Sequence, residues 1–284
     1  MTKLIPFRKN NQWGFSNSQK EIVIECKYDD VTIPFYKRNY NLALVKKNGK
    51  TCWVNTKGNE VTPFADMTHP FTDKGISVIV LNKEIDTVLQ YPNCLFVNHE
   101  GETLFKNDFL TSNGYQNGYC IGMNQDRKYG VIDYLGNIIH PFTETDYQIV
   151  WEKIGRPYDS DTRKEDLVPS KLQKFANDRY IGFKTEQGNI AIQSKYYMAH
   201  DFNEGLCPVA IEAGEFFFIN EKGEQVFNQT YYFCHNFKEG IAKVVTDKIS
   251  ENPHMHSRWG VDYYIPESAK WGYIDTNGNE YWEN

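Results

Sequence analysis

Glycines recur along the chain at a fixed spacing. The final segment, residues 270–280, reads K-W-G-Y-I-D-T-N-G-N-E, and related segments upstream carry a glycine at the same turn position. Six turn glycines are defined in this way: Gly58, Gly101, Gly136, Gly188, Gly223 and Gly278. A second set, the pre-strand glycines, lies 17 residues after a turn glycine and comprises Gly75, Gly118, Gly205 and Gly240. The next turn glycine follows 18 residues later where nothing intervenes, so the undisturbed period is 35 residues. Such a period is the signature of a repeat architecture.

Each repeat contains sequence for three short strands. Residues 42–47, 206–211 and 241–246 are apolar and β-branched, which favours a first strand. The tryptophan-glycine segment follows as the second strand, and the turn glycine then reverses the chain with a positive φ. Residues 21–25 and 189–193 typify the third strand. In the first copy, Lys20 stands where the other copies have the turn glycine.

Aromatic residues supply the core that such repeats need. Six Trp, 19 Tyr and 18 Phe make up 15% of the 284 residues. A three-stranded meander has an apolar face that it cannot bury alone, so neighbouring repeats must pack on it. We therefore predict an all-β protein of about seven tandem three-stranded meander repeats in a curved array, either a propeller-like ring or an open superhelix. The repeats predict a single domain over residues 1–284.

The repeat resembles that of the bacterial WG-repeat family. The segments that carry the resemblance are Trp271-Gly272-Tyr273-Ile274-Asp275 with Gly278, and the two pre-strand segments that end in Glu204-Gly205 and Glu239-Gly240. The second and third copies depart from the tryptophan-glycine pair, with Cys52 next to the tryptophan of the second. The resemblance implies a β-rich repeat scaffold with a role in interaction or signalling. It implies no catalytic residue, because the residues that the family shares are structural.

Charge and composition exclude several classes of protein. The chain has 31 basic and 37 acidic residues, a net charge of −6, which argues against binding nucleic acid through phosphate contacts. The sequence has neither the apolar run of a signal peptide nor a membrane span, so we expect a soluble, cytoplasmic protein without membrane contact. The six cysteines include no C-x-x-C pair, which favours reduced thiols. We expect no cofactor.

Two insertions interrupt the period. The first lies near 143–176, is densely charged, and includes Trp151, Arg156 and Tyr158. Residues 161–175 are compatible with a helix interrupted at Pro169, and the insertion displaces the strand expected ahead of Ile181. The second lies near 249–269 and includes His254, His256 and Trp259. Insertions in repeat proteins often carry the binding face, although surface decoration without function explains them equally well.

Several residues suggest metal or anion sites. His69, His200 and His235 share one repeat position and could form an array of imidazoles, but the interpretation we favour is that each hydrogen-bonds within its own repeat. His254 and His256 have the spacing of a ligand pair, yet no companion ligands lie nearby in the sequence. The segment from Asp275 to Glu280 resembles a calcium loop, but other repeats place lysine inside it, which favours a simple turn. Cys120 and Cys207 occupy a position that suits a small buried residue.

The leading functional hypothesis is a non-enzymatic scaffold for protein–protein interaction. Its protein partner, for example a toxin or a signalling component that the scaffold neutralises or regulates, would dock on the insertion-bearing faces. The candidate partner-binding residues are Trp151, Arg156, Tyr158, His254, His256 and Trp259. The main alternative is a carbohydrate-binding module whose exposed aromatic rings stack on sugars. A third hypothesis is an enzyme whose site lies on the insertions.

Overall fold

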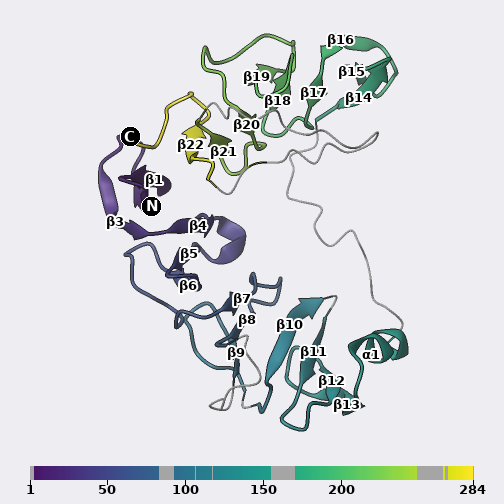
Figure 1. The fold of residues 1–284 in the computed structure, drawn as a ribbon. Helices are drawn as coiled ribbons and strands as arrows, with labels where there is room; N and C mark the ends of the chain where they lie inside the picture. Colours follow the sequence, from purple (N-terminus) through teal and green to yellow (C-terminus); the bar gives the residue numbers. More distant parts are fainter. Residues whose placement is uncertain are drawn as a thin grey trace. The chain divides into compact units, whose positions relative to one another are not determined.

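The computed structural model describes residues 3–82, 93–105, 107–116, 118–154, 170–247, 265 and 268–283. Within these residues the chain forms seven antiparallel sheets, of which six have three strands and one has four (Figure 1). Two short helices accompany them, the 3-10 helix η1 (Lys37–Asn39) and the helix α1 (Tyr147–Lys153). The prediction of an all-β repeat fold with a small helix is confirmed.

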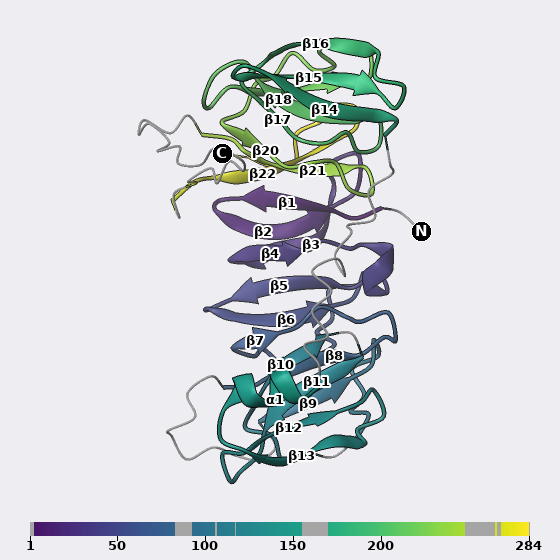
Figure 2. The ribbon, with the colours of Figure 1, turned by 90° about the vertical axis from the view of Figure 1, so that its right-hand side faces the viewer.

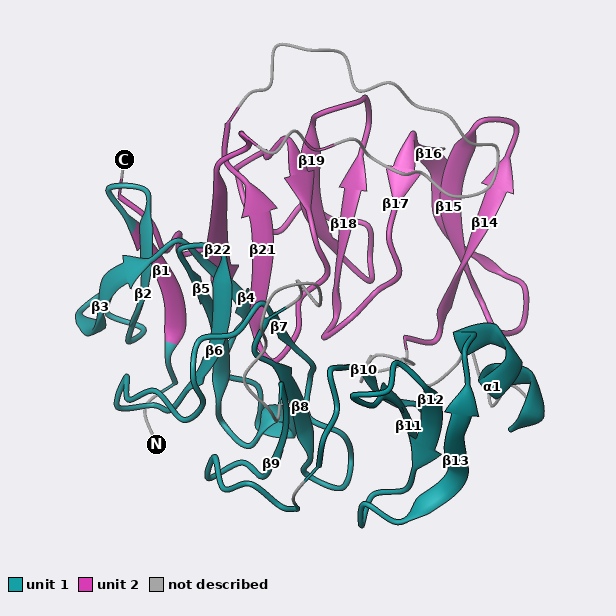
Figure 3. Ribbon diagram, turned by 60° about the horizontal axis from the view of Figure 1, so that its bottom comes forward, with its two compact units in different colours: residues 1–4, 9–164 teal, residues 5–8, 165–284 magenta. Residues whose placement is uncertain are grey.

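The contacts divide the chain into two compact units (Figure 3). Unit 1 comprises residues 1–4 and 9–164, and unit 2 comprises residues 5–8 and 165–284. The first eight residues of the chain are thus split, because residues 5–8 belong with the C-terminal part of the sequence. The prediction of a single domain over 1–284 stays a prediction.

Four sheets are built from the first half of the sequence. Their strands, in hydrogen-bonded order, are β1 (Ile5–Lys9), β2 (Gln12–Ser16) and β3 (Ile22–Tyr28); β4 (Asp30–Ile33), β5 (Ala43–Lys47) and β6 (Lys50–Val54); β7 (Met67–Thr68), β8 (Ser77–Val80) and β9 (Cys94–Val97); and β10 (Thr111–Gln116), β11 (Tyr119–Met123), β12 (Tyr129–Ile132) and β13 (Ile138–Glu144).

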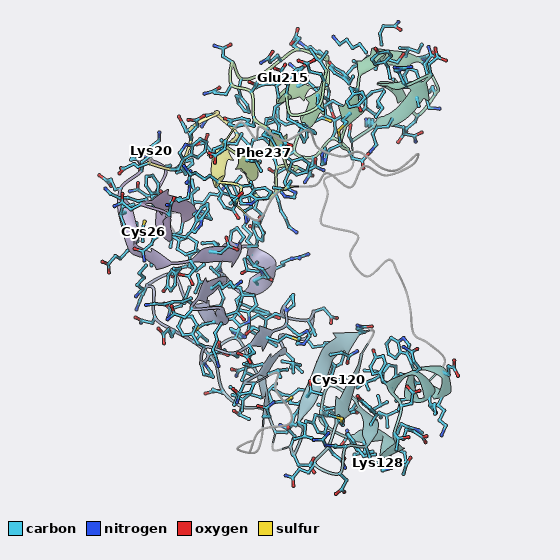
Figure 4. All side chains as sticks on the ribbon, viewed as in Figure 1. Lys20, Cys26, Cys120, Lys128, Glu215 and Phe237 are labelled. Atoms are coloured by element: carbon cyan, nitrogen blue, oxygen red, sulfur yellow. The ribbon has the colours of Figure 1, made fainter. Side chains whose placement is uncertain are left out.

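Three sheets follow in unit 2. Their strands are β14 (Leu172–Asn177), β15 (Tyr180–Thr185) and β16 (Ile190–Tyr196); β17 (Met198–Ala199), β18 (Leu206–Ala210) and β19 (Phe216–Asn220); and β20 (Phe233–Cys234), β21 (Ile241–Val245) and β22 (Trp271–Asp275). Figure 2 shows β14, β15 and β16 side by side. Figure 4 shows Phe237 beside β21 and β22, where its ring is fully buried.

The repeat glycines have the backbone conformation that the sequence predicts. All ten turn and pre-strand glycines have φ between 73° and 90°, and Lys20, which replaces the first turn glycine, has φ of 65°. Positive φ is inexpensive only for glycine, which explains why glycine marks the period. Most turn glycines also pack closely: a Cβ on Gly223 would lie 3.1 Å from Ile192, and one on Gly278 would lie 2.7 Å from Phe227.

The residue three positions before the turn glycine closes the turn. Its side-chain oxygen accepts hydrogen bonds from the backbone N–H groups two and four residues later. Asn220, for example, accepts from Lys222 N at 3.0 Å and from Glu224 N at 3.1 Å. The same pair of bonds occurs at Asn17, Asn55, Asn98, Asp133 and Asp275. These six residues are called the turn caps below.

The predicted third strand forms in only some of the repeats. β3, β13 and β16 pair with the strand that precedes the turn, namely β2, β12 and β15, as expected. In the other four sheets the segment after the turn glycine makes only isolated bridges within the described residues, such as Ile219 with Gln225. The third strand of these sheets is instead a short segment ahead of the first strand, as β17 is beside β18. The third-strand prediction is therefore wrong for these four repeats.

The first insertion is organised differently from the prediction. The helix predicted over residues 161–175 is wrong for its last part, since β14 pairs with β15 through six successive residue pairs. β14 also fills the strand position ahead of Ile181 that we expected the insertion to displace. The helix in this region is α1, which begins after the N-cap Asp146, whose carboxylate accepts from Gln148 N at 2.8 Å.

Candidate functional site

In the sheet of β7, β8 and β9, the loops that carry the two repeat glycines lie at the same end of the strands. β8 follows Gly75, β9 precedes Gly101, and the two strands pair antiparallel with Ser77 opposite Val97. The start of the first strand and the end of the second therefore meet at this end. In unit 1 these loops enclose a pocket of about 410 Å³, called the loop pocket below.

Aromatic rings form much of the wall of the loop pocket. The lining rings belong to Tyr40, His99, Phe105 and Tyr134. His99 stacks on Tyr40 with ring centroids 4.4 Å apart. Phe105 and Tyr134 each stack on a ring behind them, at 4.7 Å and 4.8 Å respectively. Because each ring is supported by a neighbour, the pocket is preformed rather than assembled on binding.

Polar side chains lie at the rim of the loop pocket. The His99 Nε2 and the Glu100 Oε1 lie 2.7 Å apart, and the Tyr134 hydroxyl donates to Asp73 Oδ1 at 3.3 Å. Burial raises the pKa of Tyr134, and the neighbouring Asp73 carboxylate raises it further. Lys74 Nζ lies 3.6 Å from Asp73 Oδ2. Tyr134 is therefore a neutral hydrogen-bond donor at ordinary pH, and the carboxylates supply the charge.

Two leucines leave apolar surface exposed at the loop pocket. Leu135 is 78% exposed and Leu104 is 43% exposed, and both line the pocket. Leu135 sits in the turn directly after Tyr134, and its backbone N–H donates to the turn cap Asp133 at 2.9 Å. An exposed leucine beside an aromatic pocket is a feature of binding surfaces, whereas the turn itself does not require it.

The sequence contains a signal for the loop pocket that the repeat pattern does not predict. The position two residues before the turn glycine, or before Lys20 in the first repeat, is Ser18, Thr56, His99, Tyr134, Glu186, Glu221 and Thr276 in the seven repeats. Only the third and fourth repeats place a ring there. The following position is polar in every repeat except the fourth, which has Leu135. Departures from the repeat pattern, rather than the insertions, mark this pocket.

The recurring histidines are fixed by their backbones. His69 N donates to Val78 O, His200 N to Pro208 O and His235 N to Lys243 O, at 2.9 to 3.0 Å. The interpretation that each histidine hydrogen-bonds within its own repeat is thus correct for the main chain. The imidazoles instead pack on neighbouring groups.

The three imidazoles have different surroundings. His69 lies against the backbone of Gly114, where a Cβ would come within 2.7 Å of Nδ1, and its buried Nε2 has no hydrogen-bond partner among the described residues. His200 packs edgewise on Phe216 and Phe233, and His235 stacks on Trp271 at 5.5 Å. Burial lowers the pKa of His200 to about 4, and His235 and Lys174 lower it as well.

No group of three or more His, Cys, Asp or Glu side chains is placed to hold a metal ion within the described part of the chain. The segment from Asp275 to Glu280 is a turn, as its likeness to the other repeats predicts. Asp275 Oδ1 accepts from two backbone N–H groups, and Oδ2 accepts from Asn279 Nδ2 and the Tyr281 hydroxyl, both at 2.9 Å.

The structure describes one of the six partner-binding residues predicted from the sequence. Trp151 lies on α1 with its side chain 6% exposed, packed with Ile121, Val131 and Val150. Its ring therefore contributes to the packing of α1 on the β10–β13 sheet. Arg156, Tyr158, His254, His256 and Trp259 lie outside the described residues, so their predicted role stays a prediction.

The cysteines are free thiols, and none forms a disulfide. Cys120 and Cys207 are fully buried, which confirms that their repeat position suits a small buried residue. Figure 4 shows Cys120 within the β10–β13 sheet. Burial raises the pKa of Cys120 to about 12 and raises that of Cys207. Protonated, enclosed thiols of this kind are poor nucleophiles.

Comparison with known families finds one similar family. The sequence matches the family described as WG containing repeat over residues 13–50, 181–212 and 216–248. The first matched segment lies in unit 1 and the other two lie in unit 2. A comparison with curated proteins gives no match. No helix among the described residues has the length and apolar character needed to cross a bilayer.

Three solved structures share distant similarity with the chain. A crystal structure of the eukaryotic initiation factor is 8% identical with a TM-score of 0.43, covering 99% of this chain and 94% of that one. BamB from Moraxella catarrhalis is 7% identical with a TM-score of 0.29, covering 85% and 93% respectively. The computationally designed Ika8 protein is 10% identical with a TM-score of 0.24, covering 89% and 86%.

Proposed function

We propose that the chain is a non-catalytic repeat scaffold that binds a protein partner at the loop pocket of unit 1. The partner inserts an apolar side chain into the pocket and places a basic residue beside the rim. A basic toxin or signalling component that the scaffold neutralises or regulates would have this chemistry. The observation that carries the proposal is the preformed aromatic pocket edged by the exposed Leu135 and Leu104.

The apolar lining favours a protein side chain as the occupant. Binding energy at protein interfaces concentrates where one partner's aromatic or aliphatic anchor fills a pocket on the other. A volume of about 410 Å³ accommodates such an anchor. The supported rings lose little conformational entropy on binding, which strengthens the interaction.

The charges at the rim favour a basic partner. The carboxylates of Asp73 and Glu100 have side-chain exposures of 73% and 55%, and Lys74 is the ammonium group beside them. Glu102 adds a third carboxylate, bound to Asn98 Nδ2 at 2.9 Å. Because the whole chain also carries a net charge of −6, a basic partner is drawn to it at long range.

Peptide selection tests this proposal. A phage-displayed library of random peptides is selected against the full chain, and enriched peptides are synthesised and titrated by calorimetry. We expect enriched peptides to combine an aromatic or aliphatic anchor with a neighbouring Lys or Arg. Leu135→Lys, which installs the residue that Lys57 and Lys222 supply at this turn position, should weaken their binding about tenfold or more.

The matched control is Ile211→Lys. Ile211 is 61% exposed and lies in unit 2, away from the lining of the loop pocket. The substitution removes a similar apolar surface and adds the same charge, so it should leave peptide affinity unchanged. Failure to enrich any peptide, enrichment of acidic peptides, or equal affinity for Leu135→Lys and the parent protein would each contradict the proposal.

A further inference from the structure

Unit 2 contains a second depression, with different chemistry from that of the loop pocket. It has a volume of about 570 Å³ and lies where Glu280 and Trp282 meet the end of β21 and the residue before β22. Its lining is mostly polar and includes Tyr231, Thr246, Asp247, Lys270, Glu280 and Trp282. It is called the polar depression below. A hydroxyl-rich ligand fits such a lining better than an apolar anchor.

Trp282 supplies a flat and fixed surface in the polar depression. A Cβ on Gly272 would lie 2.6 Å from Trp282 Cζ3, so the indole lies directly across the glycine backbone. The flanking main chain is held by β1, because Arg8 N donates to Tyr281 O at 3.2 Å and Glu283 N donates to Arg8 O at 2.8 Å. An aromatic ring held in this way presents a platform without losing side-chain entropy on binding.

Acceptors and donors converge around that platform. Glu280 Oε1 accepts from the Tyr231 hydroxyl at 3.2 Å, and the Thr246 hydroxyl donates to the Lys270 carbonyl oxygen at 3.0 Å. The first contact orients the Glu280 carboxylate and leaves its second oxygen, and the Asp247 carboxylate lies beside Thr246. Lys270 is exposed and contributes an ammonium donor. Hydroxyl groups are both donors and acceptors, so they match a mixed set of this kind.

The charges of the polar depression are balanced. Asp247 and Glu280 are opposed by Lys270 and by Arg8, which is 4% exposed and whose Nη2 lies 3.5 Å from Thr246 Oγ1. The balance disfavours a strongly anionic or cationic ligand. A neutral ligand with several hydroxyl groups and one face of C–H bonds satisfies both the charges and the indole.

We propose that the polar depression is a binding site for a neutral saccharide, one ring of which stacks on Trp282. Its hydroxyl groups donate to Asp247 and Glu280 and accept from Lys270. The site is separate from the loop pocket, so it adds a second ligand class to the proposed scaffold rather than depending on it.

An array of neutral oligosaccharides, probed with the full chain, tests the proposal. Saccharides that bind are then titrated by calorimetry against variants. We expect Trp282→Phe to weaken binding about tenfold, because the smaller ring covers less of the sugar. Trp271→Phe is the matched control, since Trp271 lies in the same unit but does not line the depression. It should leave saccharide affinity unchanged.

A second variant keeps the test independent of core packing. Asp247→Asn combined with Lys270→Met changes two side chains at the depression and leaves Trp282 in place, and it should also weaken saccharide binding about tenfold. The proposal is overturned if no neutral saccharide binds saturably, if only anionic glycans bind, or if both sets of variants bind as the parent does. Leu135→Lys should not affect saccharide binding, so the two proposals fail separately.

Discussion

The hydroxyl of Ser77 donates to the carbonyl oxygen of His69 at 2.6 Å. The thiol of Cys207 lies in the same place beside His200, with its sulfur 3.2 Å from the carbonyl oxygen. Both residues lie two positions after a pre-strand glycine. The small buried side chain at this position therefore ties the first strand of a repeat to the segment that carries the recurring histidine.

Loss of this hydrogen bond should cost more in the third repeat than in the sixth. Ser77 Oγ also accepts from Trp53 Nε1 at 3.1 Å, and Trp53 is fully buried. Ser77→Ala leaves both the indole N–H and the His69 carbonyl without this partner, which should cost about 2–3 kcal/mol of unfolding free energy. Cys207→Ala should cost about 1 kcal/mol, because a thiol is a weak donor. Urea denaturation of the two variants gives the comparison, and an equal cost would contradict it.

The turn glycines should differ in how well they tolerate alanine. Gly188 has φ of 86°, and no atom beyond its chain neighbours lies within 4 Å of the position that a Cβ would take, so Gly188→Ala meets only the conformational cost of about 1–2 kcal/mol. Gly278→Ala also forces Cβ against the buried Phe227 ring and should cost about 1–3 kcal/mol more. Both glycines lie in unit 2, so their urea midpoints can be compared directly. A smaller loss for Gly278→Ala would show that the contact is not tight.

Asp275 should contribute stability that disappears in acid. Burial raises the pKa of Asp275, but hydrogen bonds from Asn279, Tyr281 and Asn277 outweigh it and leave the pKa below its usual value. A carboxylate with a lowered pKa stabilises the fold above the unfolded pKa of about 4, and this stability is lost as the pH falls through the folded value. Asp275→Asn should cost about 1–2 kcal/mol at pH 7 and much less at pH 3. Urea denaturation at both pH values measures this, and an equal cost at pH 7 and pH 3 would contradict the prediction.

His200 should destabilise the fold as the pH falls below neutral. Its folded pKa of about 4 lies below the unfolded value of about 6.5, so the folded state resists protonation. Stability therefore decreases as the pH falls from about 6.5 toward 4, by at most about 2 kcal/mol at pH 5. His200→Phe keeps an aromatic contact with Phe233 and cannot bind the proton, so it should flatten this dependence. An unchanged slope between pH 7 and pH 5 would contradict the assignment.

Alkylation should distinguish Cys26 from the other cysteines. Cys26 is partly exposed on β3, whereas the other five are fully buried. Burial raises the pKa of Cys52 to about 11 and raises the pKa of Cys94 and Cys234 as well. In the native protein, iodoacetamide should modify Cys26 at least about 100-fold faster than the others. Mass spectrometry of digested samples measures each rate, and early modification of Cys94 or Cys234 would reveal local opening.

The regular features of the fold were predictable because each has a local cause. Positive φ at Gly58 or Gly223 follows from glycine at a fixed turn position, and the caps at Asn55 and Asn220 follow from the same spacing. The choice of the third strand is not local. In the sixth repeat β17 pairs with β18, whereas the segment at Gln225 makes only a bridge with β19, and this outcome depends on packing with neighbouring repeats.

The helix and the two proposed binding sites were harder to predict for different reasons. Tyr147, Val150, Trp151 and Ile154 have the spacing of an apolar helix face, but the longer charged stretch that follows was the more prominent signal. His99 and Tyr134 were visible as departures from the repeat. The polar depression was not, because its lining joins Tyr231, Thr246 and Trp282, which are far apart in the sequence.

The pairing of β1 with the C-terminal residues also sets an order of assembly. Arg8 is synthesised long before its partners, since its Thr246 contact lies 238 residues away and its backbone partners, Tyr281 and Glu283, come later still. Closing so long a loop is slow compared with forming any single meander. β1 leaves the ribosome early but is therefore among the last strands to form its native hydrogen bonds. Unit 2 is completed only after residues 281–283 have emerged.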